Sequence, residues 1–416
     1  MPLTARSPEA VALFDAALER YLERGGGSDE FARQALGHDD QFALAWLLLG
    51  MHQKTIGDEA GGAASMRRVA ELAPVLSDRE KSVLHTLHQI GGGPLDVAES
   101  AIATHFANWP DDRFILAQTV YFYAMRDWRP DRIARQTALY ERLNCSWGED
   151  WLLLGELAFA HGEGRDWDRA GDYADRALTG NPRNASAAHS YAHVLLETGQ
   201  AERGAQWVAD WLTAWEHPGA SYQCHLTWHQ ALCELVTEDA AAAAAKLDGL
   251  IGSLPFGALT DGSALAWRLY IEGFDMRETG RRLTMVPDLG NQPFVVAHKA
   301  MSLALAGDRA GLDRLAETWP EHAGPHAPDT AALIGAIGAF ADEDWAAAAD
   351  ALEQLAPTFH DFGGSYAQSE VYDDTLIAAL AAAGRAAQAA DRLQQRIALR
   401  NLPRDRRWLE RIQTGL

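Results

Sequence analysis

Two pairs of histidines have the spacing that places both side chains on one face of a helix. His189 and His193 are four residues apart, and His225 and His229 repeat this spacing 36 residues later. Imidazole groups titrate near neutral pH, and neutral imidazoles are also ligands of transition metals. The pairs therefore indicate either acid–base chemistry on a bound small molecule or a shared metal ion.

A structural role is the alternative, because hydrogen-bonded histidines can also tie neighbouring helices together. A shared metal ion requires a more specific geometry than a structural role does. The axes of neighbouring helices lie about 8–10 Å apart, so four imidazoles reach one ion only with suitable side-chain rotamers. We therefore assign no metal ligand from the sequence, and we keep a transition metal as an alternative.

A repeated sequence motif identifies the helices that must position these histidines. The string WLLLG occurs at residues 46–50, followed by Pro74, and again at residues 151–155, followed by Pro182. This is the W-x2-L-G signature of tetratricopeptide repeats with its closing proline. The tryptophan and leucines pack against the next helix, the glycine allows its paired helix to approach closely, and proline ends the second helix. Each repeat should be a helix hairpin.

Helical periodicity continues between these signatures, and strand-like alternation is nowhere sustained. We expect an all-α fold, a tetratricopeptide-like α-solenoid of antiparallel helix hairpins forming a single domain over residues 1–416. Such a superhelix could close into a ring. Ser77 and Glu80 have the spacing of a capping box before a helix that ends in the glycines at 91–93. Further hairpins are expected at about 112–143, 185–216, 222–251, 262–284, 293–318, 327–356 and 366–399.

Counting from the tryptophan signature assigns the histidines to first-helix positions that line the concave surface of such an array. The same count turns His85, His88, Glu156 and His298 inward. We predict acid–base or binding roles for His189, His193, His225, His229 and His298. The other expected ligand-binding residues are His85, His88, Tyr121, Glu156, Asp261, Arg268, Tyr366 and Gln368.

Three of these residues have a specific expected role. Arg268 could hold an anion with its guanidinium fork, Asp261 could orient an imidazole, and Gln368 could hydrogen-bond the ligand. Asp261 and Gln368 could equally be helix caps or tethers between helices.

Composition limits the partners. The chain has 58 acidic and 36 basic side chains, a net charge of −22, which repels nucleic-acid phosphates and anionic lipids. We expect neither nucleic acid nor membrane as a partner.

Cys145, Cys224 and Cys233 form no Cys-x-x-Cys pair, which favours a reducing compartment. Residues 1–19 read as an amphipathic helix rather than a signal peptide. We expect a soluble, cytoplasmic protein.

Several strings resemble the tetratricopeptide repeat protein 38 family over most of the chain. They are WPDD at 109–112, YFY at 121–123, AHSYAHV at 188–194, CHLTWHQAL at 224–232, LTDGS at 259–263, WRL at 267–269, VAH at 296–298 and GGSYAQ at 363–368. One departure is Tyr366, where the family usually has histidine, so a role that needs an imidazole there is in doubt. The resemblance implies a helical repeat fold with polar residues from separate repeats gathered at a site. It implies no particular reaction or ligand.

Three functions follow from these observations. The first is a histidine-rich pocket that binds a polar or carboxylate-bearing small molecule and could catalyse acid–base chemistry on it. The second is a scaffold that holds a peptide in its groove, which is the common use of such repeats. The third is a histidine-ligated metalloprotein. Whether the protein is an enzyme is left open by the sequence.

Overall fold

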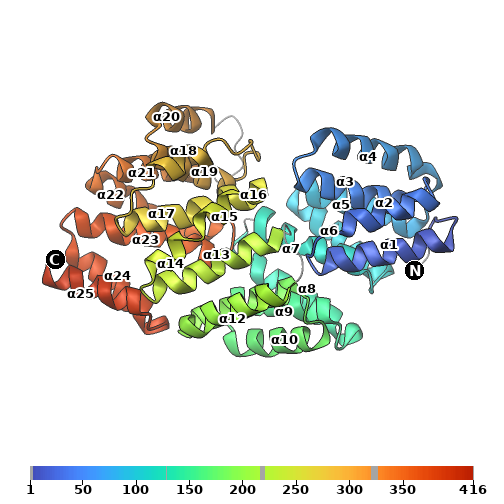
Figure 1. The fold of residues 1–416 in the computed structure, drawn as a ribbon, viewed down its shortest axis with the longest axis horizontal. Helices are drawn as coiled ribbons and strands as arrows, with labels where there is room; N and C mark the ends of the chain where they lie inside the picture. The colour runs from blue at the N-terminus through green and yellow to red at the C-terminus, as the bar shows by residue number, and fades with distance from the viewer. Residues whose placement is uncertain (1–2, 128, 216–220, 320–326, 416) are drawn as a thin grey trace. The chain divides into compact units, whose positions relative to one another are not determined.

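The computed structural model describes residues 3–127, 129–215, 221–319 and 327–415. Within these ranges every regular element is a helix, and no strand is formed (Figure 1). Successive helices pair into antiparallel hairpins, as α1 (Pro8–Leu22) does with α2 (Ser28–His38). The expected all-α, tetratricopeptide-like α-solenoid is therefore confirmed.

The chain divides into two compact units. The first consists of Met1–Asp127, Asp131–Ser190 and Glu216–Tyr222, and the second of Trp128–Pro130, Tyr191–Trp215 and Gln223–Leu416. Each unit is described by itself below. A single continuous domain over residues 1–416 stays a prediction.

The remaining helices of the first unit follow the same hairpin order. They are α3 (Ala43–Thr55), α4 (Glu59–Leu72), η1 (Ala73–Val75), α5 (Asp78–Gly92), α6 (Leu95–Asn108), α7 (Arg113–Tyr121), the π-helical turn η2 (Phe122–Arg126), α8 (Arg132–Trp147), α9 (Trp151–Glu163), α10 (Trp167–Gly180) and the beginning of α11 (Ala185–Glu197).

The two tryptophan signatures lie on α3 and α9, the first helices of their hairpins. A Cβ at Gly50 would lie 2.9 Å from the Met66 side chain, so this glycine does allow α4 to approach. At Gly155 the nearest atoms belong to the next hairpin, because a Cβ there would meet Asn184 at 2.8 Å and Ala187 at 3.5 Å. This glycine therefore also allows a close approach of the start of α11.

The second unit contains the rest of α11 and the helices that follow it. They are α12 (Ala201–Ala214), α13 (Ser221–Val236), α14 (Ala240–Ala244), α15 (Leu247–Ile251), α16 (Pro255–Gly257), the π-helical turn η3 (Ala258–Gly262), α17 (Ser263–Ile271), α18 (Arg277–Leu283), α19 (Pro293–Ala306), α20 (Arg309–Thr318), α21 (Ala327–Ala341), α22 (Trp345–Leu355), η5 (Ala356–Phe362), α23 (Tyr366–Ala382), α24 (Ala386–Leu399) and α25 (Pro403–Thr414). These bounds lie within a few residues of the expected hairpins.

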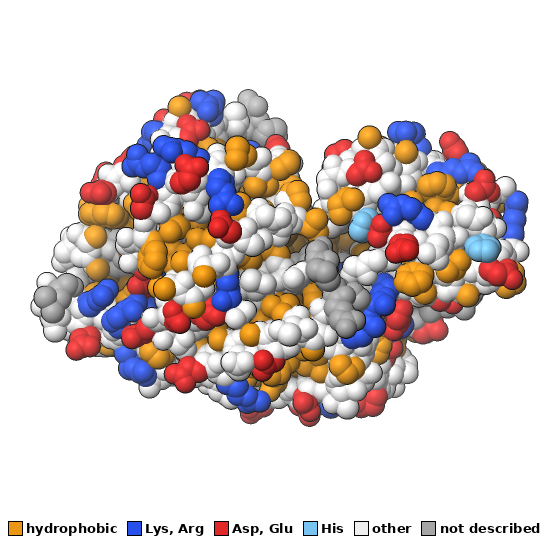
Figure 2. All heavy atoms as spheres, in the orientation of Figure 1, with side chains coloured by type: hydrophobic (Ala, Val, Ile, Leu, Met, Phe, Trp, Pro, Cys, Tyr) orange, Lys and Arg blue, Asp and Glu red, His pale blue; other side chains and the backbone are white. Residues whose placement is uncertain are grey.

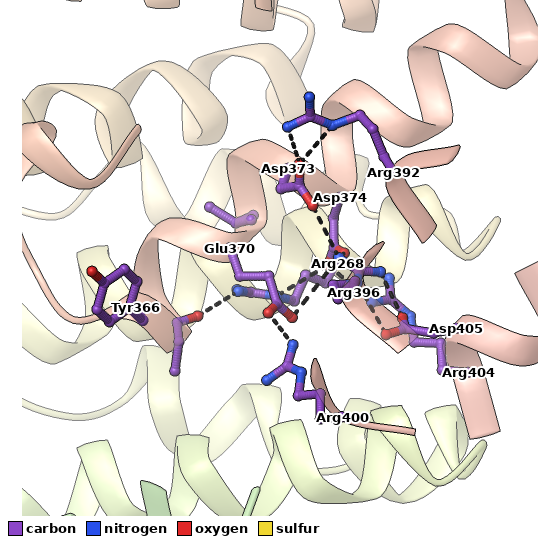
Figure 3. Close-up of polar contacts among 12 residues, drawn as sticks. Arg268, Tyr366, Glu370, Asp373, Asp374, Arg392, Arg396, Arg400, Arg404 and Asp405 are labelled. Carbon is purple, nitrogen blue, oxygen red and sulfur yellow. Dashed lines mark hydrogen bonds and ion pairs between the residues drawn. The ribbon is translucent and has the colours of Figure 1, made fainter. Parts of the chain in front are cut away.

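Buried ion pairs fasten the last helices of the second unit to its core (Figure 3). Asp374 on α23 lies 2.8 Å from Arg396 on α24 and 2.9 Å from Arg404 on α25. Arg268 on α17 approaches the same carboxylate at 3.5 Å. Burial alone would raise the pKa of Asp374, but these three guanidinium groups hold it well below its usual range. The carboxylate therefore stays ionised and joins four helices.

Candidate functional site

A histidine–aspartate pair forms the centre of the candidate site in the second unit. Nδ1 of His225 on α13 lies 3.0 and 3.1 Å from the two carboxylate oxygens of Asp261. Asp261 is buried and lies in the π-helical turn η3, directly before α17. Because a carboxylate can only accept, Nδ1 carries the proton and donates it. The expectation that Asp261 orients an imidazole fits this geometry.

Two further imidazoles lie beside His225. The ring of His229 is 4.9 Å from that of His225 and 4.4 Å from that of His193 on α11, measured between ring centroids. His193 and His229 are 36 residues apart, at equivalent positions of successive repeats, and their contact shows that the two helices lie side by side here. The indole of Trp228 stacks on His225 at 5.3 Å. The cluster is therefore histidine-rich and largely buried.

His298 on α19 is also fully buried, and its Nδ1 donates to the carbonyl oxygen of Phe294 at 2.7 Å. Burial lowers the pKa of His298 to about 4, although the nearby charge of Asp261 acts in the opposite direction. Burial also lowers the pKa of His193, to about 3, with a further contribution from His225. Both imidazoles are therefore neutral near pH 7.

The guanidinium of Arg268 is directed to partners within the protein. Nη2 donates to the carbonyl oxygen of Ala367 at 2.8 Å, Nη1 approaches that of Ala264 at 3.4 Å, and Nε faces Asp374. Its carbon atom Cζ lies 5.7 Å from the centre of the Trp228 ring. Burial lowers the pKa of Arg268 to about 10, so the side chain remains charged at pH 7. Its neutralisation by Asp374 weighs against the expected role in holding an anion.

Two polar groups near Arg268 were not assigned to the site from the sequence. The indole N–H of Trp228 and the hydroxyl of Tyr372 are buried and have no hydrogen-bond partner among the described residues. Burial raises the pKa of Tyr372, while the charge of Arg268 lowers it. A buried donor without a partner costs about 1–3 kcal/mol. A tryptophan or tyrosine in a helix normally indicates core packing, so the sequence did not assign either side chain to the site.

Gln368 and Tyr366 lie at the start of α23 and have structural contacts. The Gln368 side chain accepts from the backbone N–H of Ser365 at 3.0 Å, while the Ser365 hydroxyl accepts from the backbone N–H of Gln368. This capping box is the helix-cap alternative anticipated for Gln368. Tyr366 stacks on His360 with ring centroids 3.9 Å apart.

Two of the expected site residues are buried in the first unit. His189 lies on α11, with its ring 5.4 Å from Phe159 and 5.7 Å from Tyr222. Glu156 on α9 is fully buried, 4.0 Å from Arg24, and accepts from the Ser186 hydroxyl at 3.3 Å. Burial raises the pKa of Glu156 to about 7, against the charge of Arg24.

His85 and His88 lie outside the buried part of the fold, and the expectation that they line the concave surface stays a prediction. Both are exposed on α5, because this helix buries Val83, Thr86 and Ile90 on its other face. Tyr121 is also exposed, at the end of α7. These three side chains therefore do not join a buried polar cluster.

On the face drawn in Figure 2, acidic and basic side chains are interspersed. Within the described residues, none of the helices combines the length and apolar character needed to cross a lipid bilayer.

No protein-family model matches the chain. Among solved structures it is similar to yeast Tom70, with 12% identity over 98% of this chain and 96% of the other, at a TM-score of 0.34. It is also similar to a human IFIT1 dimer with m7Gppp-AAAA, with 13% identity, coverages of 99% and 96%, and a TM-score of 0.40. A third likeness is to the TPR domain of P58(IPK), with 10% identity, 97% of both chains covered and a TM-score of 0.23.

Proposed function

We propose that the second unit binds a polar small molecule at the cluster of His193, His225, His229 and His298, and carries out acid–base chemistry on it. The observation that carries this proposal is the hydrogen bond from Nδ1 of His225 to Asp261. A carboxylate in this position fixes the tautomer and stabilises the imidazolium that forms when the other nitrogen, Nε2, takes up a proton. His225 is the general acid–base group in this proposal.

The accessibility of the pair supports this role. About 18% of the His225 side chain is exposed, whereas only 4% of the Asp261 side chain is exposed. The imidazole can therefore exchange protons with a ligand or with solvent, while its carboxylate partner is held in a fixed, largely dry environment. That combination is typical of a positioned acid–base pair.

The surrounding groups indicate the chemistry of the ligand. His193 and His298 are neutral at pH 7, and Arg268 is already paired with Asp374. The cluster therefore offers little positive charge to a carboxylate. Trp228 and Tyr372 instead present an N–H and an O–H that lack acceptors among the described residues. We infer a neutral ligand rich in carbonyl or hydroxyl oxygens, in place of a carboxylate.

A thermal-unfolding screen tests this function with defined probes. Wild-type protein is heated with a panel of neutral polyols, sugars and amides, and with a parallel panel of carboxylates. We expect a neutral compound to raise the midpoint in wild type and in His88→Ala, because His88 is exposed on α5, but not in His225→Ala. A compound that stabilises His225→Ala as much as wild type would contradict the proposal, provided that circular dichroism shows folded variants.

Two further measurements on the purified protein distinguish the small-molecule site from a metal site and from a peptide-binding scaffold. Stoichiometric transition metal in protein purified without an affinity tag would favour a metal site over the small-molecule site. Capture of one stoichiometric peptide partner, released by substitutions that leave the histidines intact, would favour the scaffold. Either result, together with an empty compound screen, would replace the proposed function.

We also propose membership in the tetratricopeptide repeat protein 38 family. The support is the set of strings quoted above, several of which supply residues of the cluster, such as AHSYAHV at 188–194 and CHLTWHQAL at 224–232. A reducing, cytoplasmic location is consistent with the free thiols of Cys145, Cys224 and Cys233. Alignment with members of that family and fluorescence localisation of the tagged protein would test the two statements.

A further inference from the structure

A surface pocket of about 360 Å³ in the second unit is lined by none of the clustered histidines. It is formed where the turn between α11 and α12 meets the junction of α24 and α25. Gln200, Arg203 and Thr237 line one part of it, and Asn401 and Arg406 line another. The volume suits a small molecule or a single functional group of a larger one.

The two arginines of this pocket have only neutral partners. Arg203 donates from Nη2 to the Tyr191 hydroxyl at 2.8 Å and from Nη1 to Oε1 of Gln200 at 3.0 Å. Arg406 donates from Nη1 to Oδ1 of Asn401 at 2.7 Å. Neither forms an ion pair with a carboxylate in the described part of the chain. Each guanidinium is thus held by neighbours that leave its charge uncompensated.

Arg203 and Arg406 have no carboxylate partner among the described residues, although the chain has 58 acidic side chains. Arg400, which directly follows α24, differs from Arg203 and Arg406 because it is buried and paired with both Glu197 and Glu370. A guanidinium has five N–H donors in a planar fork that matches an oxyanion. Arg203 uses two of its nitrogens and Arg406 uses one, so both retain donors for a ligand.

Both basic and acidic side chains line the pocket, and their net charge is positive, which favours an anionic ligand. Glu202 also lines it and carries the opposing charge. Two arginines against one glutamate leave a net positive charge. The helices α12 and α25 begin at this pocket, and neither has a side-chain cap. Their first backbone N–H groups add to the positive potential, except at Pro403, which has no N–H.

We propose that this pocket is a binding site for a small oxyanion group, a phosphate or a carboxylate, held between Arg203 and Arg406. The site is independent of the histidine cluster and of the function proposed for it. The ligand is recognised by the two guanidinium forks, while Gln200 and Asn401 fix their directions. Because the arginines are exposed, binding weakens as salt screens their charge.

Isothermal titration of the full-length chain at low ionic strength tests the site, with inorganic phosphate in one arm and acetate in the other. Stronger binding of phosphate would assign the site to phosphate groups, and stronger binding of acetate to carboxylates. We expect the double variant R203Q/R406Q to bind the preferred anion about tenfold more weakly or worse. R281Q is the matched control, because Arg281 is exposed and paired with Glu278 on α18.

The variants R203K and R406K, which keep the charge but lose the fork, should each bind with intermediate strength. If R203Q/R406Q bound both anions as tightly as wild type and R281Q, or if wild type bound neither at roughly 10 mM, the proposal would be overturned. Circular dichroism confirms that each variant is folded. None of these outcomes depends on a ligand at the histidine cluster, so failure here would leave the acid–base proposal standing.

Discussion

Nδ1 of His225 donates to the carboxylate of Asp261, whose two oxygens lie 3.0 and 3.1 Å away. The residues are 36 positions apart and come from different repeats, α13 and η3. A helix hairpin alone could not create this pair. The solenoid brings an imidazole and a carboxylate from adjacent hairpins into hydrogen-bond contact, and the proposed acid–base chemistry depends on that contact.

The hydrogen bond to Asp261 should fix the tautomer of His225. Nitrogen-15 NMR above neutral pH should show a protonated Nδ1 and an unprotonated Nε2, because only Nδ1 faces the carboxylate. Replacement of Asp261 by leucine should allow the proton to distribute between the two nitrogens. An unchanged tautomer in folded Asp261→Leu would mean that Asp261 does not set the state of the ring.

Asp374 is predicted to be essential for stability. Asp374→Asn removes the negative charge that Arg396, Arg404 and Arg268 share. Arg396 and Arg404 keep Asp405 and Glu272 as partners, whereas Arg268 loses its one ion pair within the described residues, and an uncompensated buried cation typically costs about 3–5 kcal/mol. Urea unfolding should show a large fall in the midpoint. Asp373→Asn is the neighbouring control, because the Asp373 side chain is about 23% exposed, pairs closely with Arg392 and reaches the buried Arg396 only at 3.5 Å. Equal losses in the two variants would contradict this account of the network.

His298 should make the protein sensitive to mild acid. Its pKa is about 4 in the folded protein, against about 6.5 when unfolded. The unfolded chain therefore binds the proton first as pH falls, and stability that is complete above pH 6.5 is lost toward pH 4. His298→Gln should remove about 2 kcal/mol of the loss between pH 7 and pH 5. His85→Gln, at an exposed position, should leave the pH profile as it is.

Glu156 should act in the opposite direction. Its pKa is about 7 when folded, so its contribution is complete below the unfolded value near 4.3 and is lost as pH rises through 7. Glu156→Gln should therefore gain stability relative to wild type between pH 5 and pH 8, by up to about 3 kcal/mol. The exposed Glu59→Gln serves as control. A pH profile of Glu156→Gln parallel to that of wild type would show that this carboxyl titrates normally.

Gly280 on α18 should tolerate no side chain. A Cβ there would contact the backbone N of Ala306 and would lie 2.6 Å from the backbone C of Leu305 on α19. Gly280→Ala should cost about 1–3 kcal/mol, because backbone atoms cannot move aside easily. Gly91→Ala on α5 meets nothing within 4 Å and should be neutral or slightly stabilising. Thermal unfolding of both variants measures the difference, and equal midpoints would count against the packing described for α18.

The fold could be predicted closely from local signals. The tryptophan signatures, the prolines and the capping box of Ser77 and Glu80, which is present in the structure, all act within one hairpin. The burial of single side chains along a helix is harder to predict. His85 and His88 are exposed because the apolar face of α5 passes through Val83 and Ile90.

The candidate site was partly predictable. The repeat period related His193 to His229, which do lie together, and Asp261 was correctly associated with an imidazole. The pairing of Arg268 with Asp374 could not be read, because the two residues lie on α17 and α23 and no local pattern connects them. Arg396, Arg400 and Arg404 occur at every fourth position, which usually indicates a solvated face. Two of their acidic partners, Glu197 and Glu272, come from distant hairpins, so the burial of these arginines appears only in the folded structure.

The most direct test of the proposed function is an NMR titration of the imidazole signals with the compound that stabilises the protein most in the thermal screen. We predict that the signals of His225, His229 and His298 shift together and saturate, while those of the exposed His85 and His88 stay unchanged. The same titration of Asp261→Leu should give weaker binding. Shifts confined to His85 and His88, or saturable binding that leaves the buried imidazoles unmoved, would contradict the proposed site.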